Sequence, residues 1–332
     1  MDILMKCFFE NFENAERNSL HAKYRRRAMV AYFNTLIEGC RLGQNSEEQK
    51  TVREAIISIL RYHEQSRSKN SGVCMMGKYH NVLYVALKIC YDWQLQDTET
   101  VAALLDEIYA CERTFERLFV GALFGTNAPH FIAGWKSDFD NQEENLRAMV
   151  FFLDHATNAA CEYDNQVRFI DVSIESCGKM SPLKIAVQLG LPDKVHILLR
   201  FGALVDLNDH QHQDTMIEGI LKKLNEFDHS YPYNLVSCLQ FLLRVVPSIN
   251  CNNFNKHKQE STPFEGVMQQ FPNLVQDCIL PMNRCGLQPP ELKHLARCAV
   301  RSQLWLNCQL PNGIRTLPIP ETLQKYIDIL ED

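Results

Sequence analysis

The 332-residue sequence lacks an excess of positive charge, because 34 lysines and arginines stand against 40 aspartates and glutamates and the formal net charge is −6. Nucleic-acid binders carry a basic surface, so this balance argues against a nucleic-acid partner. Long hydrophobic runs are also missing: the stretch at 118–124 is far shorter than the roughly 20 residues that a membrane helix needs. No basic and apolar leader follows Met1. We therefore expect no membrane association and an intracellular location, in the cytoplasm, with the nucleus as a second candidate.

Paired cysteines are absent as well. The 13 cysteines are scattered singly without a C-x-x-C pair, which is typical of small buried hydrophobic residues in a reducing compartment. His210 and His212 lie in a polar connector without a second group of ligands, and His63-Glu64 lacks a second ligand at helical spacing. The sequence contains no hydrolase, P-loop, dinucleotide, zinc-protease or kinase signature. We expect no metal, no cofactor and no catalytic activity.

A helical hairpin is predicted near the middle of the chain. Ser181 can cap a helix with Pro182 in its first turn, and Gly190 can end that helix in the left-handed conformation. A second apolar stripe, at 195–199, ends at Gly202. This unit resembles an ankyrin repeat, although Lys184 occupies a position where that family has histidine.

Weaker copies of the unit are visible around it. Apolar stripes recur at 103–105, 151–153, 197–199, 241–243 and 278–280, and worn versions of the opening turn lie at 214–216 and 261–264. Their spacing exceeds the roughly 33 residues of an ankyrin repeat, so a mixed helical solenoid is the alternative. We predict an all-α chain with an N-terminal helical region (1–75), a degenerate ankyrin-repeat solenoid (76–285, clearest at 178–207) and a C-terminal module (286–332).

The C-terminal module contains the most specific pattern. Pro290 suits the first position of a helix, in which seven residues fall on one face: Leu292, Leu295, Ala296, Ala299, Val300, Gln303 and Leu304. The segment Leu317-Pro318-Ile319-Pro320 follows, and a second helix is predicted from near Glu321. About 45 residues cannot enclose a full core alone, so a partner is expected on the apolar face.

This module resembles a SOCS box, and together with the repeat it makes the chain similar to the ankyrin repeat and SOCS box family. The resemblance implies a three-helix module that binds the Elongin B and Elongin C heterodimer, within a substrate receptor of a ubiquitin ligase. The family pattern is a leucine, three residues, a cysteine, three residues and an aliphatic residue. Leu292 and Val300 match it, whereas Ala296 replaces the cysteine.

Further expectations follow from the same resemblance. Leu317, Pro318, Ile319 and Pro320 match the family's cullin box, which implies cullin-5 and its RING subunit as partners. The repeats would bind an unknown protein substrate, for which Lys184, Gln188 and His210 are the candidate contacts. The alternative is an ankyrin scaffold outside any ligase, whose SOCS box is weakened by Ala296.

Overall fold

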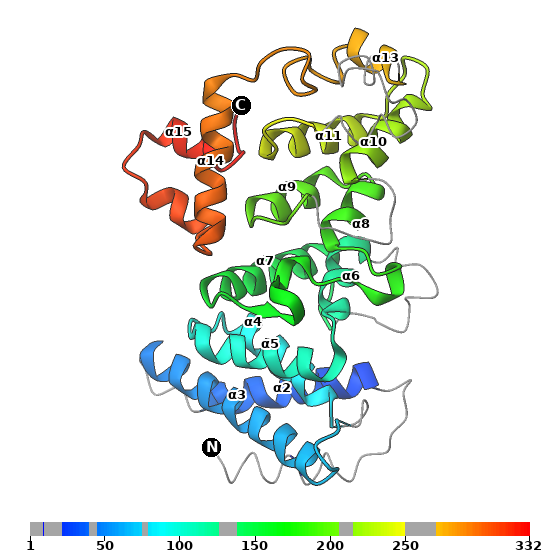
Figure 1. The fold of residues 1–332 in the computed structure, drawn as a ribbon. Helices are drawn as coiled ribbons and strands as arrows, with labels where there is room; N and C mark the ends of the chain where they lie inside the picture. The colour runs from blue at the N-terminus through cyan, green and yellow to red at the C-terminus, as the bar shows by residue number, and fades with distance from the viewer. Residues whose placement is uncertain are drawn as a thin grey trace. The chain divides into compact units, whose positions relative to one another are not determined.

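The computed structural model describes residue 9 and residues 22–39, 45–74, 79–125, 138–205, 215–249 and 270–332. The chain divides into two compact units, residues 1–178 and 179–332. In both units the described residues are mostly helical and contain almost no strand, and the expected all-α fold of stacked helices is confirmed (Figure 1). None of the helices in these ranges combines the length and the apolar character that crossing a membrane requires.

The first unit is built around α4 (Asn81–Asp92), which is buried on nearly all sides because α2, α3 and α5 pack against it. A second contact group joins α6 and α7, and α7 also packs on α5. The unit closes with a two-residue antiparallel hairpin, β1 and β2, in which Tyr163 pairs with Val167. The other elements are α2 (Ala22–Gly39), α3 (Asn45–Ser68), α5 (Thr98–Glu112), α6 (Glu116–Phe124), α7 (Gln142–Asn158), β1 (Glu162–Tyr163) and β2 (Val167–Arg168).

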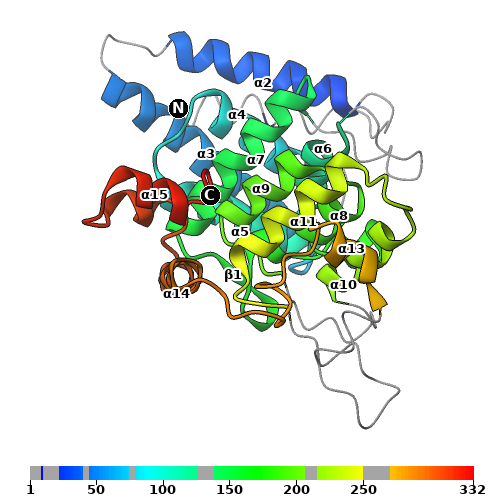
Figure 2. The ribbon, with the colours of Figure 1, turned by 90° about the horizontal axis from the view of Figure 1, so that it is seen from above.

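The second unit stacks two helical hairpins and a C-terminal module. In the hairpins α8 packs on α9 and α10 on α11, while α8 and α10, and likewise α9 and α11, are neighbours (Figure 2). The module packs on α11 through α14, and α15 packs on α14. The elements are α8 (Pro182–Gln188), α9 (Pro192–Arg200), α10 (Met216–Asn225), α11 (Tyr233–Val245), α13 (Pro272–Gln276), α14 (Leu292–Leu306), a 3-10 helix η8 (Asn312–Thr316) and α15 (Glu321–Ile327).

The capping residues behave as the sequence predicts. Ser181 accepts a hydrogen bond from the backbone N–H of Lys184 at 3.3 Å, and Gly190 has a φ of +64° just after α8. Thr215, in one of the worn repeat openings, caps α10 by accepting from the N–H of Glu218 at 3.2 Å. The predicted hairpin at 182–200 and the helix after Thr215 are therefore confirmed.

The last two predicted repeat segments, at 278–280 and 261–264, are not confirmed. The stripe at 278–280 is not helical, because α13 already ends at Gln276 and Cys278 adopts a φ of +57°. The worn opening at 261–264 lies outside the described residues. The predicted domain boundaries at residues 75 and 285 stay predictions. The two compact units divide instead at Gly178, and α3 packs on α4 and α5 across the predicted boundary at residue 75.

Candidate partner-binding site in the C-terminal module

Helix α14 begins at Leu292, two residues later than Pro290, which we expected at its first position. The difference arises at Glu291, which keeps an extended backbone as the N-cap and whose carboxylate pairs with Arg284 at 2.7 Å. That ion pair fixes the entry of the chain into the helix. It also lowers the pKa of Glu291, mainly through the hydrogen bond from Arg284.

The apolar side of α14 points away from the rest of the chain. Leu292 is 83% exposed and Leu295 is 37% exposed, Ala296 and Ala299 are exposed, and Val300 is half-buried. We call these five residues the α14 apolar face. These are five of the seven residues that the sequence assigned to one face, and within the described part of the chain nothing covers most of them. Leu304, also assigned to this face, is instead buried in the core of the module.

The opposite side of α14 is polar and buried, which the apolar periodicity of the helix did not predict. His294, Arg297 and Arg301 are each no more than 5% exposed, and Cys298 is buried beside them. A signal was present, because positions 294, 297, 298 and 301 recur at helical spacing. An apolar stripe is normally taken to face the chain's own core, so polar residues on the other side are assigned to solvent.

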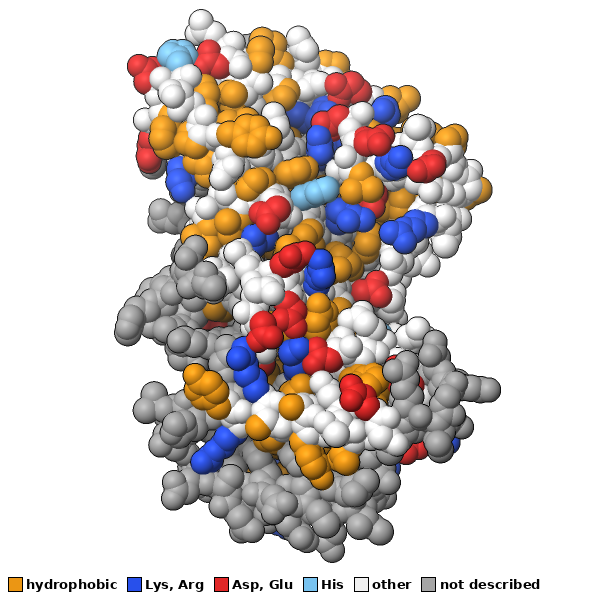
Figure 3. All heavy atoms as spheres, turned by 180° about the vertical axis from the view of Figure 1, so that it is seen from behind, with side chains coloured by type: hydrophobic (Ala, Val, Ile, Leu, Met, Phe, Trp, Pro, Cys, Tyr) orange, Lys and Arg blue, Asp and Glu red, His pale blue; other side chains and the backbone are white. Residues whose placement is uncertain are grey.

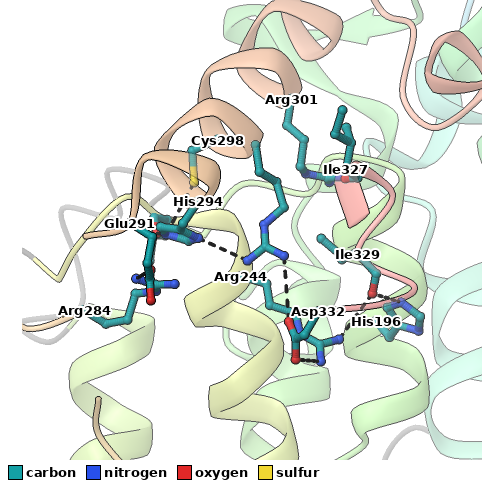
Figure 4. A network of polar contacts seen from close by, with 12 residues as sticks. His196, Arg244, Arg284, Glu291, His294, Cys298, Arg301, Ile327, Ile329 and Asp332 are labelled. Atoms are coloured by element: carbon teal, nitrogen blue, oxygen red, sulfur yellow. Dashed lines mark hydrogen bonds and ion pairs between the residues drawn. The ribbon is translucent and has the colours of Figure 1, made fainter. Parts of the chain in front are cut away.

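Two of these buried side chains, Arg301 and His294, meet the carboxyl ends of helices. Arg301 donates to the carbonyl of Leu199 in the last turn of α9 at 2.5 Å, and to the carbonyl of Ile327 at 3.0 Å. His294 Nε2 lies 2.9 Å from the carbonyl of Val246, directly after α11 (Figure 4). The last carbonyls of a helix lack partners and carry partial negative charge, so cationic and N–H donors are favoured there.

The hydrogen bonds also determine which ring nitrogen of His294 carries the proton. Because Nε2 of His294 donates to a carbonyl, Nδ1 must accept, and it does so from Arg297 at 3.1 Å. Burial lowers the pKa of His294 below its usual value, and the neighbouring guanidinium of Arg297 acts in the same direction. Burial also lowers the pKa of Arg301, to about 10, which leaves it charged at neutral pH.

The last residues of the module are held on α9 and α11. Asp328 accepts two hydrogen bonds from Arg200, at 3.1 and 2.6 Å. The carbonyl of Ile329 lies 3.1 Å from His196 Nε2 and accepts from Arg244 at 3.3 Å, and Asp332 pairs with Arg244 (Figure 4). The module is thus anchored to the helical hairpins by directional contacts on its polar side.

A small hydrophobic core joins the three helices of the module. It consists of Leu304, Leu310, Ile314, Tyr326 and Ile327, all buried. Trp305 packs against this core and lies over the turn after α9, where a Cβ on Gly202 would come within 2.8 Å of Trp305 Cδ1. Gly202 has a φ of +85°, so the close approach and the backbone both require glycine.

The proline-containing segment between η8 and α15 alternates between core and solvent. Leu317 and Ile319 pack partly on the module's core, whereas Pro318 and Pro320 are exposed. Gln324 donates to the carbonyls of Leu317 at 3.1 Å and Ile319 at 3.3 Å. The segment is therefore a fixed extended ledge, in which the prolines face solvent and Ile319 is half-buried. We call residues 317–320 the proline ledge.

The expected substrate contacts are only partly visible. Lys184 is half-buried and Gln188 is exposed, both on α8, while His210 lies outside the described residues. The backbone carbonyl of Gln188 accepts from Lys223 of α10 at 3.0 Å, so these two inner helices are linked at that point. On the face shown in Figure 3, acidic and basic side chains are interspersed and no large patch of one sign gathers among the described residues.

Comparison with known proteins concerns the same module. Residues 288–328 match the SOCS box family model. Ankyrin repeat and SOCS box protein 17 of the dog, Canis lupus familiaris, is 54% identical over 41 residues, and that of cattle, Bos taurus, is 51% identical over 41 residues. Each match covers 12% of this chain and 14% of the relative, and lies in the SOCS box region. No solved structure matches the chain significantly.

The residues matched by the SOCS box model coincide with the C-terminal module seen in the structure. The family model ends at residue 328, within the turn that follows α15, and begins four residues before α14. The three helices, their shared core and the proline ledge all fall inside it. Residues 288–328 of this chain therefore form a SOCS box.

Proposed function

We propose that the chain is the substrate-recognition subunit of a cullin-5 RING ubiquitin ligase, which binds the Elongin B and Elongin C heterodimer through the α14 apolar face. The observation that carries the proposal is the inverted placement of α14. Its His294 and Arg301 are buried against α11 and α9, while Leu292, an aliphatic side chain, is 83% exposed. Exposed apolar surface of this kind marks a site for a protein partner.

The energetics of the face favour an apolar pocket on the partner. Fully burying a leucine side chain contributes about 1.5–3 kcal/mol. Leu292 and Leu295 together offer two such anchors on adjacent turns of one helix. Ala296 and Ala299, which follow them along the helix and are exposed, are small enough to allow close approach of another backbone. The polar side of α14 is already engaged within the chain, so binding would not need to reorganise it.

Substitution of Ala296 distinguishes the proposed ligase subunit from the alternative, an ankyrin scaffold outside any ligase. The family pattern has cysteine there, and losing a buried thiol should cost about 1 kcal/mol, which corresponds to an approximately fivefold loss of affinity. We expect Ala296→Cys to strengthen a measurable affinity for Elongin B and Elongin C about fivefold. Absence of binding in the native chain together with binding in Ala296→Cys would favour the scaffold.

The proline ledge is the proposed contact for cullin-5 and its RING subunit. Leu317, Pro318, Ile319 and Pro320 match the cullin-box pattern, and the hydrogen bonds from Gln324 hold the backbone in one conformation. A preorganised segment loses little entropy when it docks. The prolines, which are exposed, are available to a partner, whereas the aliphatic side chains brace the ledge from below.

The helical hairpins are the proposed site for the protein target. Inner helices of stacked hairpins commonly form a binding face, and Lys184 and Gln188 lie on such a helix in this chain. The chain would then act by positioning: a bound target gains a high effective concentration near ubiquitin carried by other subunits. Alanine substitutions at Lys184, Gln188 and His210 should reduce capture of the target, and unchanged capture would contradict this assignment.

Reconstitution tests the proposed assembly. The chain is co-expressed with Elongin B and Elongin C, and the purified complex is mixed with cullin-5 and its RING subunit or with another cullin. We expect a stoichiometric complex that selects cullin-5, and a Pro318→Ala, Pro320→Ala variant that keeps the Elongins but loses the selection. Equal binding to both cullins would remove the cullin-5 assignment while leaving the Elongin assignment intact.

A further inference from the structure

Four potential metal ligands from distant parts of the sequence meet in the first unit. They are His63 on α3, Cys74 in the loop after α3, His80 directly before α4 and Cys111 near the end of α5. Their ligand atoms all lie within 4.8 Å of one another. Both histidines are 1% exposed and both cysteines are half-buried. We call these four residues the His2Cys2 cluster.

The distances within the cluster suit a tetrahedral ion. His63 Nε2 lies 3.3 Å from Cys74 Sγ and 3.8 Å from Cys111 Sγ, and His80 Nδ1 lies 3.6 Å from Cys74 Sγ. Zinc binds sulfur at about 2.3 Å and nitrogen at about 2.0–2.1 Å, so the nitrogen-to-sulfur edge of its tetrahedron is about 3.6 Å. The three nitrogen-to-sulfur distances in the structure lie within about 0.3 Å of this value.

A second layer of carboxylates orients both imidazoles. His63 Nδ1 lies 2.8 Å from Glu107 Oε1, and His80 Nε2 lies 2.5 Å from Glu112 Oε1. Each carboxylate accepts a ring N–H, and the other ring nitrogen is directed at the sulfurs. Binding of a metal ion would require that second nitrogen to be unprotonated. Metal-binding histidines almost always donate their second nitrogen to a carboxylate, a carbonyl or water.

The carboxylates are themselves held in place. Glu112 accepts a hydrogen bond from the hydroxyl of Tyr84 at 2.6 Å, and Glu107 pairs with Arg67 at 3.1 Å. Glu112 is buried, with 1% of its side chain exposed. A buried carboxylate needs such partners, and with them it holds the His80 ring in a single orientation.

We propose that the His2Cys2 cluster binds one Zn²⁺ in a closed, structural site. Two thiolates neutralise the charge of the ion, and two sulfur and two nitrogen ligands in a tetrahedron select zinc over magnesium or calcium. All four positions are filled by the protein, so the ion has no open position for catalysis. Its role is to tie the ends of α3 and α5 to the start of α4.

This proposal revises the expectation that the chain binds no metal. The ligands are separated by 10, 5 and 30 residues, and none of them belongs to a closely spaced pair. Sequence spacing identifies zinc sites whose ligands lie on one hairpin or loop. Here they come from two helices and the segments that flank them, so only the packing of α3, α4 and α5 brings them together.

Metal content is the first test. The full-length chain is produced with a fusion partner that lacks cysteine and without a polyhistidine tag, and zinc is measured by inductively coupled plasma mass spectrometry. We expect one zinc ion per chain in the native protein, and none in the double variant Cys74→Ser, Cys111→Ser. The matched control Cys177→Ser, Cys308→Ser removes two half-buried cysteines outside the cluster and should keep one zinc.

A second test reports on the ligands without requiring the loss of any of them. Chain produced with Co²⁺ should show thiolate-to-cobalt charge transfer and the visible bands of tetrahedral cobalt. Glu112→Gln keeps all four ligands but alters the orientation of His80, and should weaken Zn²⁺ affinity about 10- to 100-fold in competition with a chelator. Glu54→Gln, on the exposed side of α3, should leave the affinity unchanged.

Three results would overturn the proposal. One is a native chain that contains no stoichiometric zinc and takes up no cobalt. Another is a Cys74–Cys111 disulfide in the native chain, detected by mass spectrometry, since it would consume both thiolates. The third is a Cys74→Ser, Cys111→Ser variant that keeps one zinc per chain, because the ion would then lie elsewhere.

Discussion

At the scale of single residues, the SOCS box is docked by polar side chains rather than by apolar ones. His294, Arg297 and Arg301 occupy the side of α14 that faces α9 and α11, and each finds a partner there. A buried cation is costly unless it is hydrogen-bonded. The carbonyls at the carboxyl ends of the two helices supply those bonds for Arg301 and His294, and Arg297 bonds to His294. The docking geometry is therefore specified by direction as well as by area.

Acid should weaken this docking through His294. Its pKa in the folded chain lies below the usual value of 6.5, because burial and the nearby arginines disfavour the imidazolium. The contribution of His294 to stability is therefore complete above about pH 6.5 and declines as the pH falls below it. Between about pH 7.5 and pH 5.5, the unfolding free energy should fall more steeply in the native chain than in His294→Gln, which keeps a donor and an acceptor.

Urea denaturation at the two pH values checks this expectation. Burial also lowers the pKa of His196, so this residue contributes in the same direction. The unfolding free energy of His294→Gln should therefore still fall somewhat with pH. His63 is common to both proteins, so its contribution cancels in the difference. Equal slopes would show that His294 is not held neutral against Arg297.

Gly202 should be intolerant of a side chain for two reasons. Its φ of +85° costs a non-glycine residue about 1 kcal/mol, and its Cβ would meet Trp305, which adds about 1–3 kcal/mol of overpacking. We expect Gly202→Ala to lower the unfolding free energy by about 2–4 kcal/mol. Gly286→Ala is the matched control, because Gly286 has a φ of +80° with nothing within 4 Å, and it should cost only about 1 kcal/mol.

Equal losses in the two glycine variants would mean that Trp305 does not approach the turn after α9 as closely as the structure shows. Thermal or urea denaturation of the full-length chain measures both losses. The emission of Trp305 offers a local signal for the same comparison, because this side chain lies at the contact.

At the scale of elements, the proline ledge depends on one side chain of α15. Gln324 donates to the carbonyls of Leu317 and Ile319, and each such bond contributes about 0.5–1.5 kcal/mol. Gln324→Ala should therefore weaken cullin binding about tenfold while leaving Elongin binding unchanged. Thr322→Ala, at an exposed position of the same helix, is the control. A Gln324→Ala variant that binds the cullin as the native chain does would show that the ledge keeps its shape without the side chain.

The helices whose signals are local were predictable from the sequence. Ser181 and Gly190 delimit α8 by capping and by a left-handed turn, and the region after Pro320 begins α15 as expected. The start of α14 was placed two residues early, because proline at the first position is a tendency that the pairing of Glu291 with Arg284 overrides. The stripe at 278–280 was wrongly assigned to a helix, since three apolar residues do not define a period.

Features that depend on packing were not predictable. The five residues of the α14 apolar face were identified, but the periodicity could not show that His294 and Arg301 face inward to carbonyls of α9 and of the turn after α11. The His2Cys2 cluster was missed for a similar reason, since its ligands converge only when α3, α4 and α5 pack together. In both cases the determining contacts join residues that are far apart in the sequence.

At the scale of the whole molecule, the two compact units carry different features. The second unit combines stacked helical hairpins with a SOCS box, and presents the α14 apolar face. The first unit contains the His2Cys2 cluster in a core built around α4. The proposed role as a substrate receptor requires a surface for the target and a separate surface for the ligase, and the second unit contains the helices proposed for both.

The central claim is that the α14 apolar face binds Elongin B and Elongin C. Calorimetric titration of the heterodimer into the full-length chain measures it directly, with Leu292→Asp as the variant and Thr322→Asp as a control of equal charge on α15. We predict a one-to-one complex for the native chain and the control. For Leu292→Asp we predict an affinity at least about 100-fold lower, since a charge would replace a leucine that is buried in the complex. Equal affinity of the native chain and Leu292→Asp, or no binding by either, would contradict the account.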